Sequence, residues 1–311
     1  MHNPAAGDES QPARDELLAL LQRAGHEVLY QSVKERGWTK VLKARADLVA
    51  VAGGDGSVGR VARRMVGRRE PLAILPTGTA NNLARTLGVA DRPVAELIAS
   101  WPSLRRQPVD VGVARGPWRR RLFLEGAGFG LLTGPIAAGD AGESGDTGGA
   151  AVAGKSGAAS PGAGGGDDVA RNVEELRRRL ENLAPVEIDA TLDGADVSGR
   201  YLLFVAMVAR FIGPNLPLAA HGLGDGTLGV VMVPERERAQ LDRQLAAWAR
   251  GERGSQLGME RGRQLRIRWT GATFHIDDKP WPEPGRRRPK PPAEIELTLA
   301  REQLDFLVPA N

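Results

Sequence analysis

Two glycine-containing turns hold the residues whose types and spacing could support chemistry in this chain. Gly53-Gly54-Asp55-Gly56-Ser57 and Pro76-Thr77-Gly78-Thr79 each follow a short apolar run and precede apolar residues at helical spacing. Glycine lets the backbone approach a ligand closely, and the start of a helix presents unpaired N–H groups, so a phosphate is the natural ligand. Ser57 and Thr79 could equally serve only as helix caps, and one such turn alone could be only a tight turn.

Together the two turns predict a single site, because each of them ends a strand that reads as buried. The strands are expected over 47–52 and 71–75, and parallel strands would place both turns at the carboxyl edge of one sheet. Further elements are expected as helices over 15–24, 38–46 and 93–100 and as a strand over 28–30. This alternation predicts an α/β domain.

At these residues the chain resembles the diacylglycerol kinase catalytic-domain family, which bacterial lipid kinases share with sphingosine and ceramide kinases. Residues 53–57 are similar to the family's GGDGT motif, which NAD kinases also carry. Residues 76–85, PTGTANNLAR, are similar to the more specific PxGTxNDxAR motif, with Asn82 where the family usually has Asp. The resemblance implies an α/β N-terminal domain with a parallel sheet, like that of NAD kinases and phosphofructokinases, followed by a β-rich C-terminal domain.

The resemblance also implies a nucleotide site. ATP phosphates would lie on the two turns, and Asp55 would help to place Mg²⁺. Asn3 and Gly7 match an NPxxG-like segment that borders the nucleotide, although only Met1 and His2 precede it, so the usual first strand is either vestigial or missing from the sequence. The expected nucleotide-binding residues are Asn3, Ser32, Gly53, Gly54, Asp55, Gly56, Ser57, Gly78, Thr79 and Asn81.

The second half of the chain alternates with a period of two from Val109 onward, which predicts a β-rich domain. We expect domain one to comprise 1–107 with 295–311 and domain two to comprise 108–294, with strands at 186–192, 201–209, 228–233, 265–269 and 273–276. Residues 137–168 are rich in Gly, Ala, Ser and Asp, which predicts a disordered insert, either a tolerated surface insertion or a lid. An apolar stripe from Val169 to Leu183 predicts a helix that faces either the core or a lipid tail.

A metal site is implied by the glycine-rich segment that ends in Asp225-Gly226-Thr227. In relatives that hold a structural Mg²⁺ at this segment, the ligands would correspond to Asp225 with main-chain oxygens of Gly222 and Thr227. Oxygen ligands suit a hard cation. The other interpretation is an ordinary Asp-Gly turn, since one carboxylate is a thin metal site.

The proton acceptor is expected in Asp277-Asp278-Lys279-Pro280, which resembles the family's DGEP turn. Lys279 stands where the family has its proposed general base, a Glu. Lysine is a poor base unless its pKa is depressed, so Asp277 or Asp278 would have to accept the proton. Glu125 and Met207 also stand where relatives tend to have Asn.

Composition narrows the functional classes. The 311 residues contain no cysteine, which excludes a thiolate zinc site, and the histidines His2, His26, His221 and His275 are too scattered to suggest a metal cluster. The longest apolar stretch, 201–209, is too short to span a bilayer, and no secretory signal is visible, so a cytoplasmic protein is expected. The net charge of +4 comes with dispersed arginine clusters, which are either solvated faces or an attraction to the anionic inner face of a membrane. Nucleic acid is disfavoured because few aromatic residues interleave these clusters.

These observations predict an ATP-dependent lipid kinase of lipid metabolism and phospholipid biosynthesis, with ATP and Mg²⁺ as cofactors. Its acceptor would be a hydroxyl of diacylglycerol or of a related lipid, facing the nucleotide across an interdomain cleft. Asp55, Asp277 and Asp278 are the expected catalytic residues. Two alternatives stay open: a catalytically silent nucleotide- or lipid-binding member of the family, and a kinase with a non-lipid acceptor, such as an NAD kinase. The sequence does not specify the oligomeric state.

Overall fold

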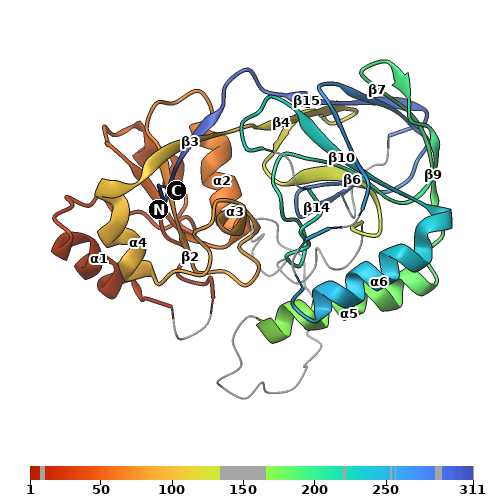
Figure 1. The fold of residues 1–311 in the computed structure, drawn as a ribbon. Coiled ribbons are helices and arrows are strands. Elements are labelled where there is room, and N and C mark those ends of the chain that lie inside the picture. Colours follow the sequence, from red (N-terminus) through yellow and green to blue (C-terminus); the bar gives the residue numbers. More distant parts are fainter. Residues whose placement is uncertain are drawn as a thin grey trace.

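The first of two sheets carries the glycine turns. The computed structural model describes residues 1–7, 11–133, 166–219, 222–252, 254–255, 257–283 and 289–310. The four strands of this sheet lie in the order β1 (Val49–Gly53), β2 (Leu72–Pro76), β16 (Leu304–Val308) and β3 (Arg105–Val109). β1, β2 and β16 are parallel and β3 is antiparallel at the edge, so the expected α/β domain is confirmed (Figure 1).

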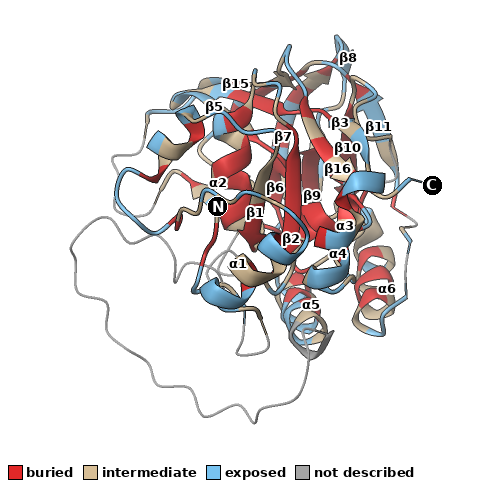
Figure 2. Ribbon diagram, turned by 90° about the vertical axis from the view of Figure 1, so that its left-hand side faces the viewer, coloured by how far each residue is buried: buried red, intermediate tan, exposed pale blue. Residues whose placement is uncertain are grey.

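Helices surround this sheet and bury its apolar faces. They are α1 (Arg14–Arg23), α2 (Asp55–Met65), α3 (Asn82–Thr86) and α4 (Val94–Ser100), with short 3-10 helices at Trp38–Lys43 and Trp101–Ser103. Val58, Val61 and Met65 recur on one face of α2 and are 2%, 0% and 1% exposed, because they pack against the buried strands β1 and β2 (Figure 2). This packing fixes the start of α2 at the end of β1.

Two local predictions about this domain were wrong. Residues 28–30 form no strand, and the parallel bridges instead join His2 to both Ser32 and Ala52. Residues 1–3 therefore take the place of a short inner strand, with the N–H of Asn3 donating to the carbonyl of Ala52 at 2.9 Å. The helix expected over 38–46 is a 3-10 helix that ends at Lys43.

The second sheet has twelve strands and forms most of the other half of the molecule (Figure 1). Its main order is β14-β13-β6-β9-β7-β12-β15-β4-β5, while β10 pairs with β9 and β11, and β8 pairs with β7. Its neighbouring strands pair antiparallel, as the period of two predicts. The strands are β4 (Gly112–Gly116), β5 (Arg119–Phe123), β6 (Gly126–Gly130), β7 (Val186–Leu192), β8 (Ala195–Asp196), β9 (Gly199–Met207), β10 (Leu228–Pro234), β11 (Met259–Gly262), β12 (Leu265–Trp269), β13 (Phe274–Ile276), β14 (Lys279–Trp281) and β15 (Ala293–Leu299).

Two helices, α5 (Gly166–Glu181) and α6 (Arg238–Ala249), pack against each other and against this sheet (Figure 1). Val173, Leu176 and Leu180 of α5 are 1%, 0% and 1% exposed and belong to one core with β9 and β10. The apolar stripe thus faces the protein core. Among the described helices, none has the combination of length and apolar character that crossing a bilayer requires.

The chain moves between the two sheets at two places. β3 ends in the first sheet at Val109, and β4 begins in the second sheet at Gly112. The alternating valines at 109, 111 and 113 suggest one continuous strand, but the chain changes sheets between them. Near the other end, β15 pairs in the second sheet and only β16 returns to the first. The division into 1–107 with 295–311 and 108–294 stays a prediction, but the return begins at Leu304 rather than at 295. Most of the expected insert, 137–168, lies outside the described residues.

Leu176→Ala tests the packing of α5. Leu176 is fully buried, so the substitution should lower the free energy of unfolding by about 3 kcal/mol through lost transfer energy and an unfilled cavity. Urea denaturation measures the change. Arg178→Ala is the control, because the Arg178 side chain is 63% exposed and its ion pair with Glu175 lies on the surface. Equal stabilities of the two variants would contradict the core role of the stripe.

Candidate active site at the junction of the two sheets

The two glycine turns touch each other. Parallel pairing places Gly53 beside Pro76, so β1 and β2 end at the same level. A Cβ atom built on Gly78 would lie 2.4 Å from the Cα of Gly54, a distance that no side chain tolerates. Position 78 therefore requires glycine, and a Cβ on Gly54 would lie a tight 3.1 Å from the Cα of Gly78. The contact places two backbone edges side by side, as a phosphate site needs.

Side-chain hydrogen bonds hold the surrounding loops in place. Asn81, in the left-handed region at φ 54°, accepts from the N–H of Gly78 at 3.1 Å and closes the second turn. Asn3 is 1% exposed and donates to the hydroxyl of Ser57 at 2.9 Å. A Cβ atom on Gly7 would lie 2.2 Å from the carbonyl oxygen of Thr77. The structure thus brings the segment 3–7 and both glycine turns together.

Asp55 connects the first turn to the second. It is the first residue of α2, and its Oδ1 accepts from the N–H of Leu83 in α3 at 3.1 Å. Gly56 and Ser57 follow it in the first turn of α2, and Thr79 is exposed beside Gly78. A carboxylate at the beginning of a helix is stabilised by the helix dipole, which favours the charged form that a cation would need.

Ser32 lies one strand further from the turns. Its side chain is 6% exposed, and its hydroxyl accepts from the N–H of Lys34 at 3.2 Å. Because Ser32 pairs with His2, which in turn pairs with Ala52, it belongs to the same edge of the first domain. Its predicted contact with a nucleotide stays a prediction.

Asp277 joins the two sheets rather than standing free. Asp277 and Asp278 form the two-residue turn between β13 and β14, with Asp277 at φ 51°. The Asp277 carboxylate accepts from the N–H groups of Leu124, Glu125 and Gly126 at 2.9 to 3.3 Å. Its Oδ2 lies 2.8 Å from Nη1 of Arg63 in α2, and its side chain is 8% exposed. Burial raises the pKa of Asp277, while Arg63 and the N–H donors oppose that shift.

Asn82 makes the second link across the junction. Its Nδ2 donates at 2.9 Å to Oε2 of Glu125, in the loop before β6, and at 2.9 Å to the carbonyl of Gly213. Glu125 is 9% exposed. Burial, followed by the negative charges of Asp55, Asp277 and Asp278, raises the pKa of Glu125 well above that of an exposed glutamate. Two of the positions that depart from the family pattern, Asn82 and Glu125, therefore meet in one hydrogen bond.

Several buried polar atoms around this junction have no partner among the described residues. They include the hydroxyl of Thr77, Oδ1 of Asn82 and Nε2 of His275. A buried polar atom without a partner costs free energy, so such atoms mark places where a ligand or water binds. Thr77 and Asn82 both belong to the second glycine turn and its helix.

The predicted metal residues lie in a loop that the protein itself already ties down. Oδ1 of Asp225 accepts from the N–H and hydroxyl of Thr227 at 3.0 and 2.6 Å, and Arg261 lies 3.6 Å from Oδ2. Gly222 lies beside Asp225, with Oδ2 3.1 Å from the position of a Cβ on Gly222. Over the described residues, no group of three or more His, Cys, Asp or Glu side chains could hold a metal ion. Magnesium at Gly222, Asp225 and Thr227 stays a prediction.

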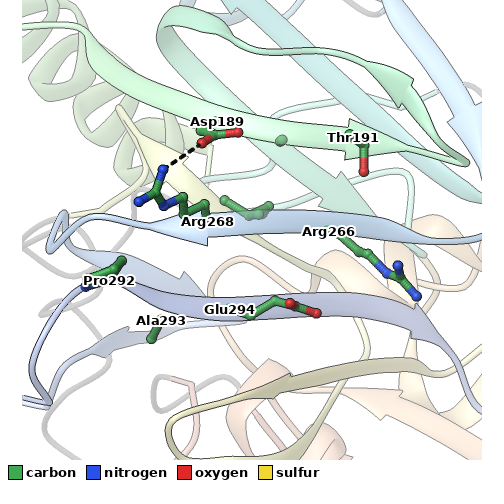
Figure 3. A pocket seen from close by; sticks show the side chains of 9 residues that line it. Asp189, Thr191, Arg266, Arg268, Pro292, Ala293 and Glu294 are labelled. Atoms are coloured by element: carbon green, nitrogen blue, oxygen red, sulfur yellow. Dashed lines mark ion pairs between the residues drawn. The ribbon is translucent and has the colours of Figure 1, made fainter.

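An open hollow of about 440 Å³ lies elsewhere, over β7, β12 and β15 (Figure 3). Two of its charged side chains, Arg268 and Asp189, form an ion pair at 3.7 Å. None of the predicted site residues lines it. We therefore place the chemistry at the glycine turns, where buried polar groups converge, and interpret the hollow as a feature of a solvated sheet face.

Two residues of this junction escaped the sequence analysis. Arg63 was counted only as part of an arginine cluster, because its position in α2 lies off the apolar face that Val58 and Val61 share. Glu125 was counted only as a departure from the family pattern. The sequence does not show that Asp277, 214 positions away from Arg63, reaches it.

Gly78→Ala tests the contact between the turns. Its Cβ would force the backbones of Gly54 and Gly78 apart, so the free energy of unfolding should fall by about 2 kcal/mol. Gly56→Ala is the matched control, because a Cβ there meets nothing within 4 Å and alanine favours the helix by about 0.5–1 kcal/mol. Urea denaturation of both variants is the measurement, and an unchanged stability of Gly78→Ala would contradict the contact.

His275→Gln tests the burial of a neutral histidine behind the Asp277 turn. Burial lowers the pKa of His275 from 6.5 to about 4. Between these values the unfolded chain binds a proton that the folded chain does not, so stability falls as the pH falls from 6.5 to 4. Compared with wild type, His275→Gln should lose about 2 kcal/mol less unfolding free energy between pH 7 and pH 4.5. Equal losses, measured by urea denaturation at both pH values, would mean that His275 is accessible to protons.

Comparisons with known proteins show which proteins this chain is similar to. Residues 1–114 match the model of the diacylglycerol kinase catalytic domain. The diacylglycerol kinase of Bacillus subtilis (strain 168) is 24% identical over 271 residues, which are 81% of this chain and 78% of that protein. A protein of Pseudomonas aeruginosa (strain UCBPP-PA14) named "Probable lipid kinase YegS-like" is 35% identical over 139 residues, 42% of this chain and 43% of its own.

Solved structures support the fold over the whole chain. A crystal structure from Bacillus anthracis str. Sterne, titled "a putative diacylglycerol kinase", superposes with a TM-score of 0.67 at 20% identity, and the match covers 99% of this chain and 95% of that chain. Another from the same organism gives a TM-score of 0.61 at 18% identity. Residues 1–114, which carry both glycine turns, are therefore similar to the diacylglycerol kinase catalytic domain, and the likeness over the rest of the chain is one of fold.

Proposed function

We propose that this protein is an ATP-dependent lipid kinase that phosphorylates a hydroxyl of diacylglycerol or of a related lipid. The contact of Gly54 with Gly78, next to the carboxylate of Asp55, carries the proposal. Phosphoryl transfer asks a protein mainly to position the reactants and to neutralise charge. Two backbone edges in contact supply the positioning, and a cation held by carboxylates would supply the charge.

The glycine turns suit the phosphates of ATP, and Asp55 offers a carboxylate beside them for Mg²⁺. The turns are narrow because no side chain separates them, which suits the phosphates of ATP, and the unpartnered hydroxyl of Thr77 offers a further hydrogen bond. Asp55 would hold Mg²⁺ at the phosphates, and Gly222, Asp225 and Thr227 would form the second, structural site. Bound Mg²⁺ neutralises phosphate charge and so favours attack by a hydroxyl.

The predicted catalytic residues would have different roles. Asp55 would act at the nucleotide, and Asp277 is held by Arg63 and three N–H groups, which favours a positioning role. Asp278 is exposed in the same turn and faces no such competition. The lipid would approach from the β-rich domain, at the surface of a membrane that the protein meets peripherally.

A silent nucleotide-binding protein is the second candidate. It is favoured by two observations: Lys279, which takes the place of the expected base, is exposed, and Asp277 has both oxygens occupied. Transfer and binding must therefore be measured separately.

The deciding experiment is transfer of ³²P from Mg-ATP to diacylglycerol, ceramide and sphingosine in mixed micelles, with NAD as a non-lipid acceptor. We expect wild-type transfer to a lipid and at least about a 100-fold loss in Asp55→Asn, because the amide removes the negative charge but keeps an oxygen for the N–H of Leu83. Asp189→Asn is the control, since its side chain is 61% exposed on the outer sheet.

Each result has a distinct meaning. Transfer only to NAD would overturn the lipid acceptor. ATP binding without transfer to any acceptor would favour the silent protein. Full activity of Asp55→Asn would remove Asp55 from the site.

A further inference from the structure

Glu125 is a buried carboxylate at the place where the two sheets meet. The residue directly precedes β6, and its carbonyl accepts from the N–H groups of Val208 and Ala209 at 3.0 and 3.3 Å. Its own N–H donates to Asp277 at 2.9 Å. The backbone on both sides is therefore fixed, and the side chain reaches Asn82, which follows the second glycine turn.

One oxygen of Glu125 remains open to a ligand. Among the described residues, the only hydrogen bond to its side chain comes from Asn82, which donates to Oε2. The Asn82 amide nitrogen donates to two acceptors, Glu125 and the carbonyl of Gly213, which orients the amide so that its Oδ1 points away from both. Asn82 is only 3% exposed, and its Oδ1 has no partner among the described residues. Oε1 of Glu125 and Oδ1 of Asn82 are both acceptors, so each of them can receive a hydrogen bond from a donor such as a hydroxyl.

The other carboxylates of the junction are less suited to accept a proton. Both oxygens of Asp277 are engaged, by three N–H groups and by Arg63. Asp55 accepts from the N–H of Leu83 and lies at the phosphate turn. Asp278 is exposed, so water competes for its oxygens. Lys279 carries a positive charge and is exposed as well.

We propose that Glu125 is the catalytic base of the phosphoryl transfer, through its Oε1, and that Asn82 orients it. The assignment rests on the proposed lipid kinase function. In the reaction, the acceptor O–H bond breaks and Glu125 takes the proton. The acceptor oxygen forms a bond to the γ-phosphorus of ATP, and the bond from that phosphorus to the bridging oxygen breaks, so that ADP leaves with the electron pair. Protonated Glu125 then returns its proton to water.

The electrostatics of the site agree with this role. Burial, and after it the negative charges of Asp55, Asp277 and Asp278, raises the pKa of Glu125 well above that of an exposed glutamate, and a raised pKa makes a carboxylate a stronger proton acceptor. The same burial makes the charged form of Glu125 costly, so replacing Glu125 with the neutral glutamine should remove that desolvation cost. Structural carboxylates behave in the opposite way, because removing their charge weakens the fold.

The test compares wild type with Glu125→Gln, Glu125→Asp and the control Glu187→Gln, which lies exposed on β7. We measure lipid phosphorylation between pH 5.5 and 9, the Kd of an ATP analogue and the Tm. Glu125→Gln should lose about 100-fold or more in kcat and should lose the acidic limb of the pH profile. Its nucleotide Kd should stay within about threefold, and its Tm should be equal or higher. Glu125→Asp should keep part of the activity and the limb, and Glu187→Gln should match wild type.

Other outcomes would overturn the assignment. If Glu125→Gln keeps the activity of an active wild type, or keeps the acidic limb, Glu125 is not the base, although the kinase function stands. If Glu125→Gln loses activity together with Tm and nucleotide affinity, Glu125 is a structural residue. If wild type phosphorylates no acceptor while it binds the analogue, the proposed function itself fails, and this assignment fails with it.

Discussion

The contact of Gly54 with Gly78 is the constraint on which the candidate site depends. The distance between their backbones leaves no space for a Cβ atom on Gly78, so the ends of β1 and β2 cannot separate without losing the shape of both turns. Parallel pairing sets the level of the two strand ends, and the packing of α2 on the sheet sets where the helix begins. The candidate site therefore depends on the register of β1 and β2. Its glycines leave the backbone open for a ligand to approach at the ends of these strands.

Across this edge, two polar contacts place the β-rich half of the molecule. Asp277 pairs with Arg63, and Asn82 bridges Glu125 and Gly213. Ion pairs buried in this way contribute little net stability because desolvation offsets their attraction, but they demand one geometry. Burying the charge of Glu125 costs stability as well. The buried carboxyl groups of Glu125 and Asp277, whose pKa values are raised, thus lie where the proposed chemistry occurs, and perturbed pKa values are typical of active sites.

Much of this arrangement could be predicted from the sequence, and the failures have physical causes. β7 and β12 have the predicted bounds because their side chains alternate between a core face and a solvated face. The alternating valines at 109–113 predicted one strand, because a pattern of burial does not reveal that the chain changes sheets at Asp110. The strand expected over 28–30 does not form, and its central residue, Leu29, is 64% exposed because no described strand pairs with this segment. The roles of Arg63 and Glu125 depend on contacts between residues far apart in sequence, which no local pattern encodes.

The position of β16 between β2 and β3 affects how the chain can fold during synthesis. β2 and β3 are separated by a strand that is made almost two hundred residues after β3. Until residues 304–308 leave the ribosome, one edge of β2 is open and β3 has no partner in its sheet. The first sheet therefore cannot complete its folding before the β-rich half has been synthesised. An open edge of Leu72–Pro76, fully apolar and buried in the folded protein, is a surface that invites wrong pairing. Rapid folding of the second half would shorten the time for which that edge is open.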